Sequence, residues 1–545
     1  MDKEALRQIQ HDLEFLKQER SEWETQWQDI VSYILPFRGK FLSRGDQPNQ
    51  DVNRMEKIVD STASRALRIL SAGMQSGLTS PSRPWFRLGL FDQDLEQYHP
   101  VKAWLGEVER IMRRVFSYSS FYNAVHTTYS ELAGFGSNAL YVEPSEDTQI
   151  AFRPLTIGEF YFGQDAAGRI DALYRWFWTP VRAAAQRWGE DALSGTAKGL
   201  LRKAPYKQIQ IVHVVKPSDE GSKTRLPYQS IYYEVGAPDG QTLSESGYNE
   251  FPYMCPRWET NGSEPYGRGP GDLVLPDVKM LQEMNKDRLR ATKKVNDPPL
   301  RVPSSFKGRL KSIPGGINYV DSQANEAVGP LYEIKPDIPA VNLSIEDVRA
   351  AIRDGFYTDL FVMLAQTDKN MTATEVAERH EEKLLVLGPV VERLQSEFLG
   401  PLIDRVFNIL VRDNMLPRPP KEMEGAEINI EYISLLAQAQ KMVGTQAVES
   451  VAGFAGKAVQ FDPTVLDRVD SDEMIKQYAD MVGAPTDILR SDEAVQQLRQ
   501  QRQQQQQAAA MSEQMDNVAQ SAKTLSETQT DRQNALTQML GLTRG

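Results

Sequence analysis

Apolar side chains recur at alternating steps of three and four between residues 6 and 34, and this spacing predicts one long amphipathic helix. Pro36 ends the helix, because the residue before a proline avoids helical backbone angles. Arg20 is the single polar residue in the stripe. We expect the stripe to dock on the chain's own domain, with a two-stranded coiled coil as the alternative. The apolar positions are Leu6, Ile9, Leu13, Leu16, Trp23, Trp27, Ile30 and Ile34.

Helical periodicity continues in residues 53–77 and 101–134, on either side of a turn-rich stretch at 79–84. From about residue 139 to 258 the pattern changes to short runs of β-branched and aromatic residues, such as 211–215 and 230–235. One short helix at 181–188 interrupts these runs. The pattern therefore predicts a helical lobe followed by a β-rich region, and an α+β fold that is mainly α.

Two further helices are predicted around a proline-rich module. The first covers residues 272–295 and places Val274, Val278, Leu281 and Leu289 on one face. The module from residue 296 onward contains Pro298, Pro299, Pro303 and Pro314 and should consist of turns and short strands. The second helix starts at Ser344, and its stripe is formed by Ile345, Val348, Ile352, Phe356, Leu360 and Met363.

A polar break then precedes the clearest helix start in the chain. Thr372 and Glu375 form a capping box, so a long helix should begin there. We expect kinks at Gly388-Pro389 and Gly400-Pro401, and an end before the proline-rich residues 416–420. A brief strand at 427–432 and an Ala- and Gln-rich helical region at 434–489 follow.

The final segment is rich in glutamine, which usually indicates solvated disorder. An apolar stripe nevertheless continues through it, and this spacing favours a helix that packs on copies of itself. The stripe consists of Met511, Met515, Val518, Ala522, Leu525, Leu536 and Met539. Both interpretations of the tail remain open from the sequence.

The composition narrows the possible classes of protein. The 545 residues correspond to about three to four folding units. No apolar run reaches the roughly 18 residues of a membrane span, and the charged N-terminus lacks a secretory signal, so we expect a cytosolic product. Cys255 is the only cysteine, which excludes an intrachain disulfide and a cysteine-based zinc site. The net charge of -12 argues against a general electrostatic grip on nucleic acid.

The sequence lacks the common catalytic motifs. Neither a phosphate-binding P-loop nor a histidine-based zinc helix is present, and the five histidines are scattered, so no catalytic residue, metal site or cofactor is predicted. The glycine-rich sequence between Gly267 and Gly271 could cradle a phosphate at a helix start, but Pro270 removes one amide, and a hinge is the favoured interpretation. In the predicted helix at 279–294 basic residues outnumber acidic ones, although the chain as a whole is acidic. For a single helix considered alone, a solvent-exposed face explains such a cluster of basic residues.

The order of these elements resembles the head-to-tail connector, or portal, family of short-tailed phages. The similarity covers residues 1 to about 490. Its most specific part is Met371-Thr-Ala-Thr-Glu-Val376, and it leaves out the glutamine-rich tail. The other motifs that carry it are the N-terminal tryptophan helix ending at Pro36, Tyr266-Gly-Arg-Gly-Pro-Gly-Asp272, Asn296-Asp-Pro-Pro-Leu300 and Leu416-Pro-Arg-Pro-Pro420.

The resemblance implies a ring of twelve subunits at one capsid vertex, through which double-stranded DNA is packaged and later ejected. The ring would assemble in the host cytoplasm with capsid and scaffolding proteins, and would dock the terminase large subunit and then a tail adaptor protein. Residues 1–271 and the long kinked helix 372–426 match the wing, 272–295 and 342–365 the stem, 296–341 the clip, 366–371 the channel loop, and 427–490 the crown. Residues 491–545 would form a helical, barrel-like tail.

The same resemblance assigns roles to individual residues. Side chains facing the DNA channel would be Gln366, Thr367, Asp368, Lys369, Asn370, Lys286, Lys293 and Lys294. Partner proteins would meet the clip at Arg301, Lys307, Arg309 and Lys311. Subunit packing would use Val274, Val278, Ile352 and Phe356. The alternatives are a coiled-coil assembly scaffold and a phosphate-binding enzyme built on the glycine-rich loop.

Overall fold

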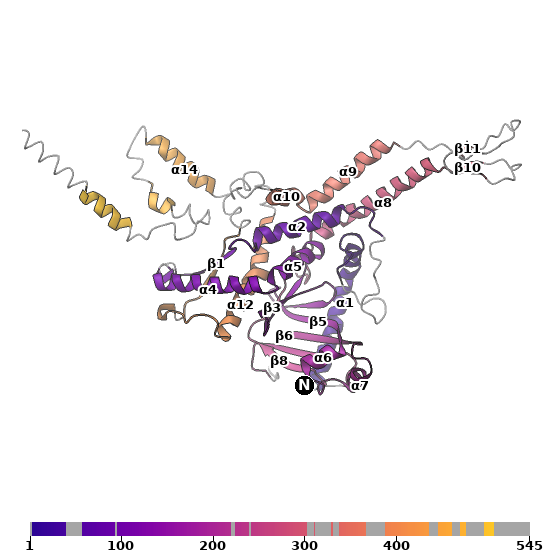
Figure 1. The fold of residues 1–545 in the computed structure, drawn as a ribbon, viewed down its shortest axis with the longest axis horizontal. Helices are drawn as coiled ribbons and strands as arrows, with labels where there is room; N and C mark the ends of the chain where they lie inside the picture. Colours follow the sequence, from indigo (N-terminus) through magenta and orange to yellow (C-terminus); the bar gives the residue numbers. More distant parts are fainter. Residues whose placement is uncertain are drawn as a thin grey trace, which may run out of the picture. The chain divides into compact units, whose positions relative to one another are not determined.

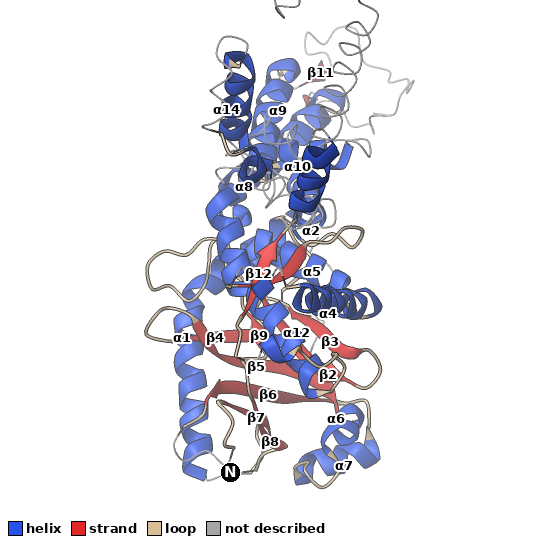
Figure 2. Cartoon of the chain, turned by 90° about the vertical axis from the view of Figure 1, so that its left-hand side faces the viewer, coloured by secondary structure: helices blue, strands red, loops and turns tan. Residues whose placement is uncertain are grey.

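The computed structural model describes residues 3–39, 57–92, 95–96, 98–219, 224–238, 241–301, 310, 329–330, 337–366, 387–423, 425–434, 445–459, 469–475 and 495–505. These belong to two units, Met1–Gly444 and Thr445–Gly545. Helices and antiparallel sheets occur together in the first unit (Figures 1 and 2), so the predicted α+β class is confirmed. In the described part of the chain, no helix is long and apolar enough to cross a bilayer.

Helix α1 (Lys3–Tyr33) buries the predicted stripe within its own unit. Its first half, with Leu6, Ile9 and Leu13, packs on aromatic and aliphatic side chains of a five-stranded sheet. Its second half, with Trp23 and Trp27, enters the main core. Docking on the chain's own domain is therefore confirmed, and the stripe is not free to form a coiled coil.

Arg20 is buried in the middle of α1, where its charge is fully partnered. Its Nη1 donates to the carbonyl oxygens of Gly158 (3.0 Å) and Phe160 (2.7 Å), and its Nη2 donates to the Tyr161 hydroxyl (3.0 Å). The guanidinium also pairs with Glu24 and lies 3.7 Å from the centre of the Tyr161 ring. The polar residue in the stripe thus fixes α1 to the start of the sheet.

The β-rich region forms two antiparallel sheets. The larger has the order β4-β5-β6-β7-β8 and the smaller β3-β2-β9. The predicted strands at 211–215 and 230–235 are β6 and β7. The bounds are β2 (Ala139–Ser145), β3 (Gln149–Leu155), β4 (Phe160–Gln164), β5 (Ile170–Pro180), β6 (Gln208–Pro217), β7 (Tyr228–Glu234), β8 (Ser244–Tyr248) and β9 (Tyr253–Met254).

Helices cover these sheets and fill the core between them. The predicted insertion is α6 (Val181–Trp188), but a second short helix, α7 (Gly195–Lys203), follows it and was not predicted. Two glycines weaken the helical signal of α7 in the sequence. In the structure the Ser194 side chain caps the helix by accepting a hydrogen bond from the Ala197 amide. The predicted helix at 101–134 is two helices, α4 (His99–Tyr118) and α5 (Phe121–Phe135), and α2 spans Thr62–Leu78.

An unpredicted strand, β1 (Phe86–Leu90), pairs antiparallel with β12 (Ile428–Tyr432). The pairing confirms the predicted strand at 427–432. It also places these residues in the first unit, which extends to Gly444, although we expected the crown to begin at residue 427.

Helices α8 (Pro270–Asn296) and α9 (Ile338–Gly355) lie side by side, and the short pair β10 (Leu300–Arg301) and β11 (Gly329–Pro330) follows α8 (Figure 1). Helix α9 begins before the predicted Ser344, because the Asp337 side chain caps it by accepting from the Ala340 amide. The prediction of one helix through Met363 is wrong. Tyr357, at a φ of 52°, separates α9 from α10 (Thr358–Gln366).

The described part of the long helix runs from residue 387 to Arg412, so it ends before the proline-rich residues 416–420, as the sequence predicts. A π-helical turn (Gln395–Leu399) precedes α12 (Gly400–Arg412), at the position of the predicted Gly400-Pro401 kink. After α12 a 3-10 turn covers Lys421–Met423. Thr372 and Glu375 of the predicted capping box lie outside the described residues.

The second unit contains α14 (Thr445–Ala458) and helical segments at 471–475 and 495–505. Within it, Arg499 pairs with Asp472 at 2.7 Å. The predicted apolar stripe from Met511 to Met539 lies outside the described residues.

Replacing Arg20 with Met should destabilise the subunit by about 3 kcal/mol, since the variant leaves buried carbonyl groups without a donor. Denaturant unfolding of the monomeric chain measures this loss. Glu22→Ala on the exposed side of the same helix is the control and should change stability by less than about 0.5 kcal/mol. Equal, small effects of both variants would show that Arg20 does not fix α1.

Candidate functional site

The residues that lead into α8 press against the end of α5. A Cβ on Gly271 would lie 2.2 Å from the carbonyl oxygen of Gly134, and one on Gly267 would lie 2.5 Å from that of Gly136. Because any side chain would collide with backbone, these glycines allow two chain segments to touch directly. The glycine-rich sequence therefore serves close packing at the start of α8.

The amides of this loop are already used inside the chain. The Gly267 amide donates to the Ser137 hydroxyl (2.7 Å), the Arg268 amide to the Glu259 carbonyl (2.7 Å), and the Gly269 amide to the Asp272 carboxylate (2.8 Å). They are not directed toward an external anion, so the arrangement does not support the phosphate-binding alternative.

Asp272 also links α8 to α1, because Gln26 donates to its carboxylate at 2.8 Å. Burial raises the pKa of Asp272 to about 6, against the opposing hydrogen bond from Gly269. The start of α8 is thus fixed by both α5 and α1.

Four residues were expected to pack subunits together: Val274, Val278, Ile352 and Phe356. All four are buried within a single chain, where α8 and α9 pack on each other and on the main core. They hold the two helices of one chain together, and their burial leaves no exposed surface at these positions. The sequence pattern identifies a buried face but not which chain covers it.

A buried polar network joins α8 to the segment before α2. Gln282 is 1% exposed, and its Oε1 accepts from the amides of Val59 (2.7 Å) and Asp60 (2.8 Å). Its Nε2 donates to the Asp60 carbonyl oxygen at 2.9 Å. Gln282 therefore provides hydrogen-bond partners for three backbone groups that would otherwise lie unpaired beneath α8.

The Asp60 carboxylate extends the network to α9. Arg349 donates to it through Nε (2.9 Å) and Nη2 (2.5 Å), and Asn285 donates at 3.4 Å. Burial alone would raise the pKa of Asp60, but hydrogen bonds from Thr62 and Arg349 lower it below the ordinary value. We call Asp60, Gln282, Asn285 and Arg349 the Asp60 network. Sequence reasoning missed it, and its only signal was two amide side chains on the apolar side of α8.

The expected channel residues are described only in part. Lys286 pairs with Glu283 at 2.7 Å, whereas Lys293 and Lys294 are exposed near the end of α8 and make no ion pair in the described structure. Gln366 is the last residue of α10. Thr367, Asp368, Lys369 and Asn370 lie outside the described residues.

The expected clip residues are described less completely. Arg301 is exposed and pairs with Gly329 in the β10–β11 ladder. Lys307, Arg309 and Lys311 lie outside the described residues.

The outward faces of α8 and α9 carry apolar side chains that sequence reasoning did not single out. Leu273 is 75% exposed and Met280 46% exposed on α8, and Leu343 is 68% exposed on α9. Their signal in the sequence is that they are apolar but lie off the main stripe of each helix.

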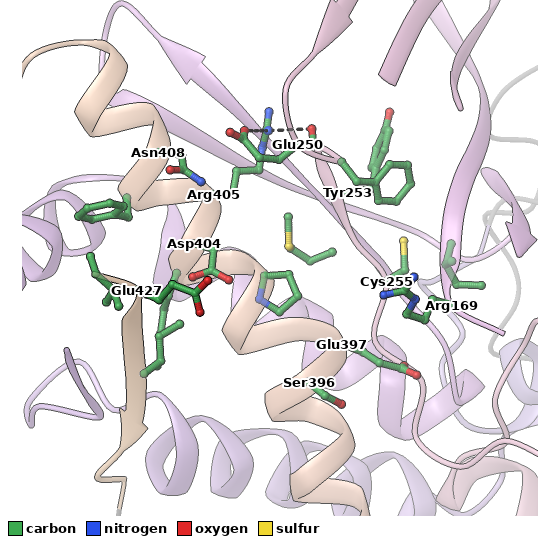
Figure 3. A pocket seen from close by; sticks show the side chains of 18 of the residues that line it. Arg169, Glu250, Tyr253, Cys255, Ser396, Glu397, Asp404, Arg405, Asn408 and Glu427 are labelled. Atoms are coloured by element: carbon green, nitrogen blue, oxygen red, sulfur yellow. Dashed lines mark hydrogen bonds and ion pairs between the residues drawn. The ribbon is translucent and has the colours of Figure 1, made fainter. Parts of the chain in front are cut away.

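A cavity of about 890 Å³ lies between α12, β12 and residues 250–257 (Figure 3). Ion pairs cross its walls: Glu250 accepts from Arg405 (3.2 Å) and Arg412 (2.6 Å), and Glu397 accepts from Arg257 (2.6 Å). These ion pairs fasten α12 and the π-helical turn to the β-rich region.

The other polar groups of the cavity do not form a reactive arrangement. Burial raises the pKa of the Cys255 thiol well above its usual range, which holds the sulfur in its weakly nucleophilic form. The described residues that line the cavity include Asp404, but they include no histidine that could act as a base for the Cys255 thiol. Across the described residues, no group of three or more His, Cys, Asp or Glu side chains could hold a metal ion.

Asp60→Asn should destabilise the subunit by about 2 kcal/mol, because Arg349 loses its charged acceptor while the shape is kept. Hydrogen exchange on the monomeric chain should then quicken in α8 and α9 more than in α4. Asp347→Asn, at an exposed position of α9, is the matched control and should leave exchange unchanged. Unchanged exchange in Asp60→Asn would mean that the network does not hold the helix pair.

Comparison with known proteins agrees with the resemblance seen in the sequence. Residues 6–489 match a family model described as bacteriophage head to tail connecting protein. The chain is 40% identical over 535 residues to the probable portal protein of Bordetella phage BPP-1. The match covers 96% of this chain and 95% of that protein. It is also 40% identical over 533 residues to the portal protein of Salmonella phage epsilon15, with the same shares covered. The chain therefore belongs to the family of bacteriophage head to tail connecting proteins.

Proposed function

We propose that the chain is a phage portal subunit and that twelve copies of it form a closed ring at one vertex of the capsid. Double-stranded DNA would enter and leave through this ring. The observation that carries the proposal is 40% identity to two portal proteins along 96% of the chain. The role is structural rather than catalytic, so the terminase large subunit supplies the packaging motor and no cofactor is needed.

In this proposal α8 and α9 form the stem, residues 296–341 the clip, and residues 366–371 the channel loop. The wing comprises residues 1–271 and the long helix 372–426. The crown and the helical, barrel-like tail follow, at 427–490 and 491–545. Capsid and scaffolding proteins meet the ring during assembly in the host cytoplasm, and the clip meets the motor and then the tail adaptor.

A conduit has to handle DNA without binding it tightly. Each phosphate that a basic side chain neutralises strengthens binding through counterion release, so a strongly basic channel would hold its cargo. The net charge of -12 per subunit makes the ring as a whole acidic. Lys286, Lys293, Lys294 and the loop residue Lys369 then act as a few weak contacts with the DNA backbone.

Ring closure requires a heterologous contact, in which one surface of each subunit meets a different surface of the next. We assign this contact to the outward faces of α8 and α9, in place of the residues buried inside the chain. Exposed Leu273 and Met280 on α8 would meet exposed Leu343 on α9 of the next subunit.

Leu343→Asp should reduce ring assembly at least tenfold while leaving the subunit folded, because a charge would enter an apolar contact. Sedimentation of the purified protein measures the ring fraction, and circular dichroism reports the fold. Ala103→Asp, at an exposed position of α4, is the control and should form rings normally. Wild-type ring yield from Leu343→Asp would reject this face. Ile352→Asp is unsuitable for the purpose, because Ile352 lies in the core of the subunit.

Replacing Arg301, Lys307, Arg309 and Lys311 together with Ala should leave rings intact but abolish DNA packaging. The four basic residues are close together in the sequence of the clip segment and are proposed to contact the motor. A defined motor assay with purified rings measures packaged DNA. Packaging at the wild-type rate would refute the assignment, while failure to form rings would place these residues in the subunit contact instead.

A further inference from the structure

The connection between β5 and β6 is longer than the sheet requires. The two strands are antiparallel neighbours paired as far as Pro180 and Gln208, so a tight turn could join them. Residues 181–207 occupy this position instead, and they contain α6 and α7. We call residues 181–207 the α6–α7 module.

The module is a fixed structure with its own small core. Val181, Ala184 and Ala197 pack with side chains of β6 and β7, including Ile211 and Tyr232. The Ser194 hydroxyl donates to the Glu234 carboxylate at 2.8 Å, which ties the start of α7 to β7. Surface side chains of the module are therefore held in a defined arrangement.

The charge of the module is opposite to that of the chain. It contains six basic side chains, namely Arg182, Arg187, Lys198, Arg202, Lys203 and Lys207, and two acidic ones, Glu190 and Asp191. Its formal charge is +4 within a chain of -12, so the remainder of the chain carries -16.

Only part of this positive charge is used inside the module. Arg187 pairs with Glu143, and Arg202 lies 4.0 Å from Glu190 at an exposed site, where a pair contributes little. The side chains of Lys203 and Lys207 are exposed and have no hydrogen-bond or ion-pair partner in the described structure. Their charges are free to meet a partner.

An aromatic ring adjoins these free charges. Tyr206 lies between Lys203 and Lys207 in the sequence and is 70% exposed. Arg182 donates from Nη1 to the Tyr206 hydroxyl at 2.9 Å, and its guanidinium lies 5.8 Å from the ring centre. Arg182 thus orients the ring while its own charge has no acidic partner in the described structure. An oriented exposed aromatic among basic side chains is typical of an interaction surface.

We propose that the α6–α7 module is a docking surface for an acidic segment of a partner protein, contacted by Arg182, Tyr206, Lys203 and Lys207. Charge complementarity selects an anionic partner. A long duplex would have to continue from this small patch onto the acidic remainder of the chain, whereas a short acidic protein segment fits the patch alone. The observations therefore favour protein over DNA.

The surface is separate from the proposed ring contact. Figures 1 and 2 place α6 and α7 at the end of the first unit remote from α8 and α9. A partner can therefore occupy the module without competing for the proposed contact at α8 and α9, and the inference does not depend on ring formation.

The test uses the full-length protein and two labelled probes, a 20-residue poly-L-glutamate and a 20-base-pair DNA duplex, followed by fluorescence anisotropy. The triple variant Arg182→Gln, Lys203→Gln and Lys207→Gln should bind the glutamate probe about tenfold more weakly than wild type, as expected for the loss of three exposed ion pairs. Tyr206→Ala, which keeps the lysines, should weaken binding a few-fold. Sedimentation should show the same assembly state for every variant.

The control triple variant replaces Arg83, Arg418 and Lys421 with Gln. These residues are exposed outside the α6–α7 module, and their replacement changes the net charge by the same amount. It should bind the glutamate probe within twofold of wild type. Three results would each overturn the proposal: no binding of the glutamate probe by wild type, equal loss in both triple variants, or tighter binding of the duplex through the same residues.

Discussion

The direct backbone contact between the end of α5 and the start of α8 is the constraint on which the rest of the described structure depends. Gly134 and Gly136 face Gly267 and Gly271 at distances that leave no room for a Cβ. The direction in which α8 leaves the core is therefore set by backbone geometry, and side chains cannot adjust it. Everything proposed for the stem follows from that direction.

The Asp60 network then holds α9 to α8 and both helices to the segment before α2. It consists of a buried amide that satisfies backbone groups and a buried carboxylate that an arginine keeps charged. Buried polar groups of this kind add less to stability than apolar packing of equal volume, but they accept few alternative partners. In a ring, where every subunit has to present the same faces, a unique helix arrangement matters more than additional stability.

The sequence predicted those features that depend on periodicity. The α1 stripe, the β-rich region, α8 and the start of β12 follow from spacing and residue type. The break at Tyr357 was missed because the apolar pattern continues through it, although Asp354-Gly355 just before it is a turn signal. β1 was missed because it spans only five residues and directly follows the turn-rich stretch at 79–84, although its apolar residues do alternate. The burial of Val274 and Ile352 could be predicted but not which chain covers them, since a stripe shows only that a face is buried. Arg20 was noticed as a polar interruption, but its partners are about 140 residues away in the sequence and could not be inferred.

The central claim is that this chain closes into a ring whose subunits meet through the outward faces of α8 and α9. A cryo-electron microscopy map of the purified assembly tests it most directly. The account predicts a closed ring around an open channel, with Leu343 of each subunit against α8 of the next and Ile352 inside its own subunit. A two-fold dimer, an open filament, or a ring in which α8 and α9 touch no neighbouring subunit would contradict it.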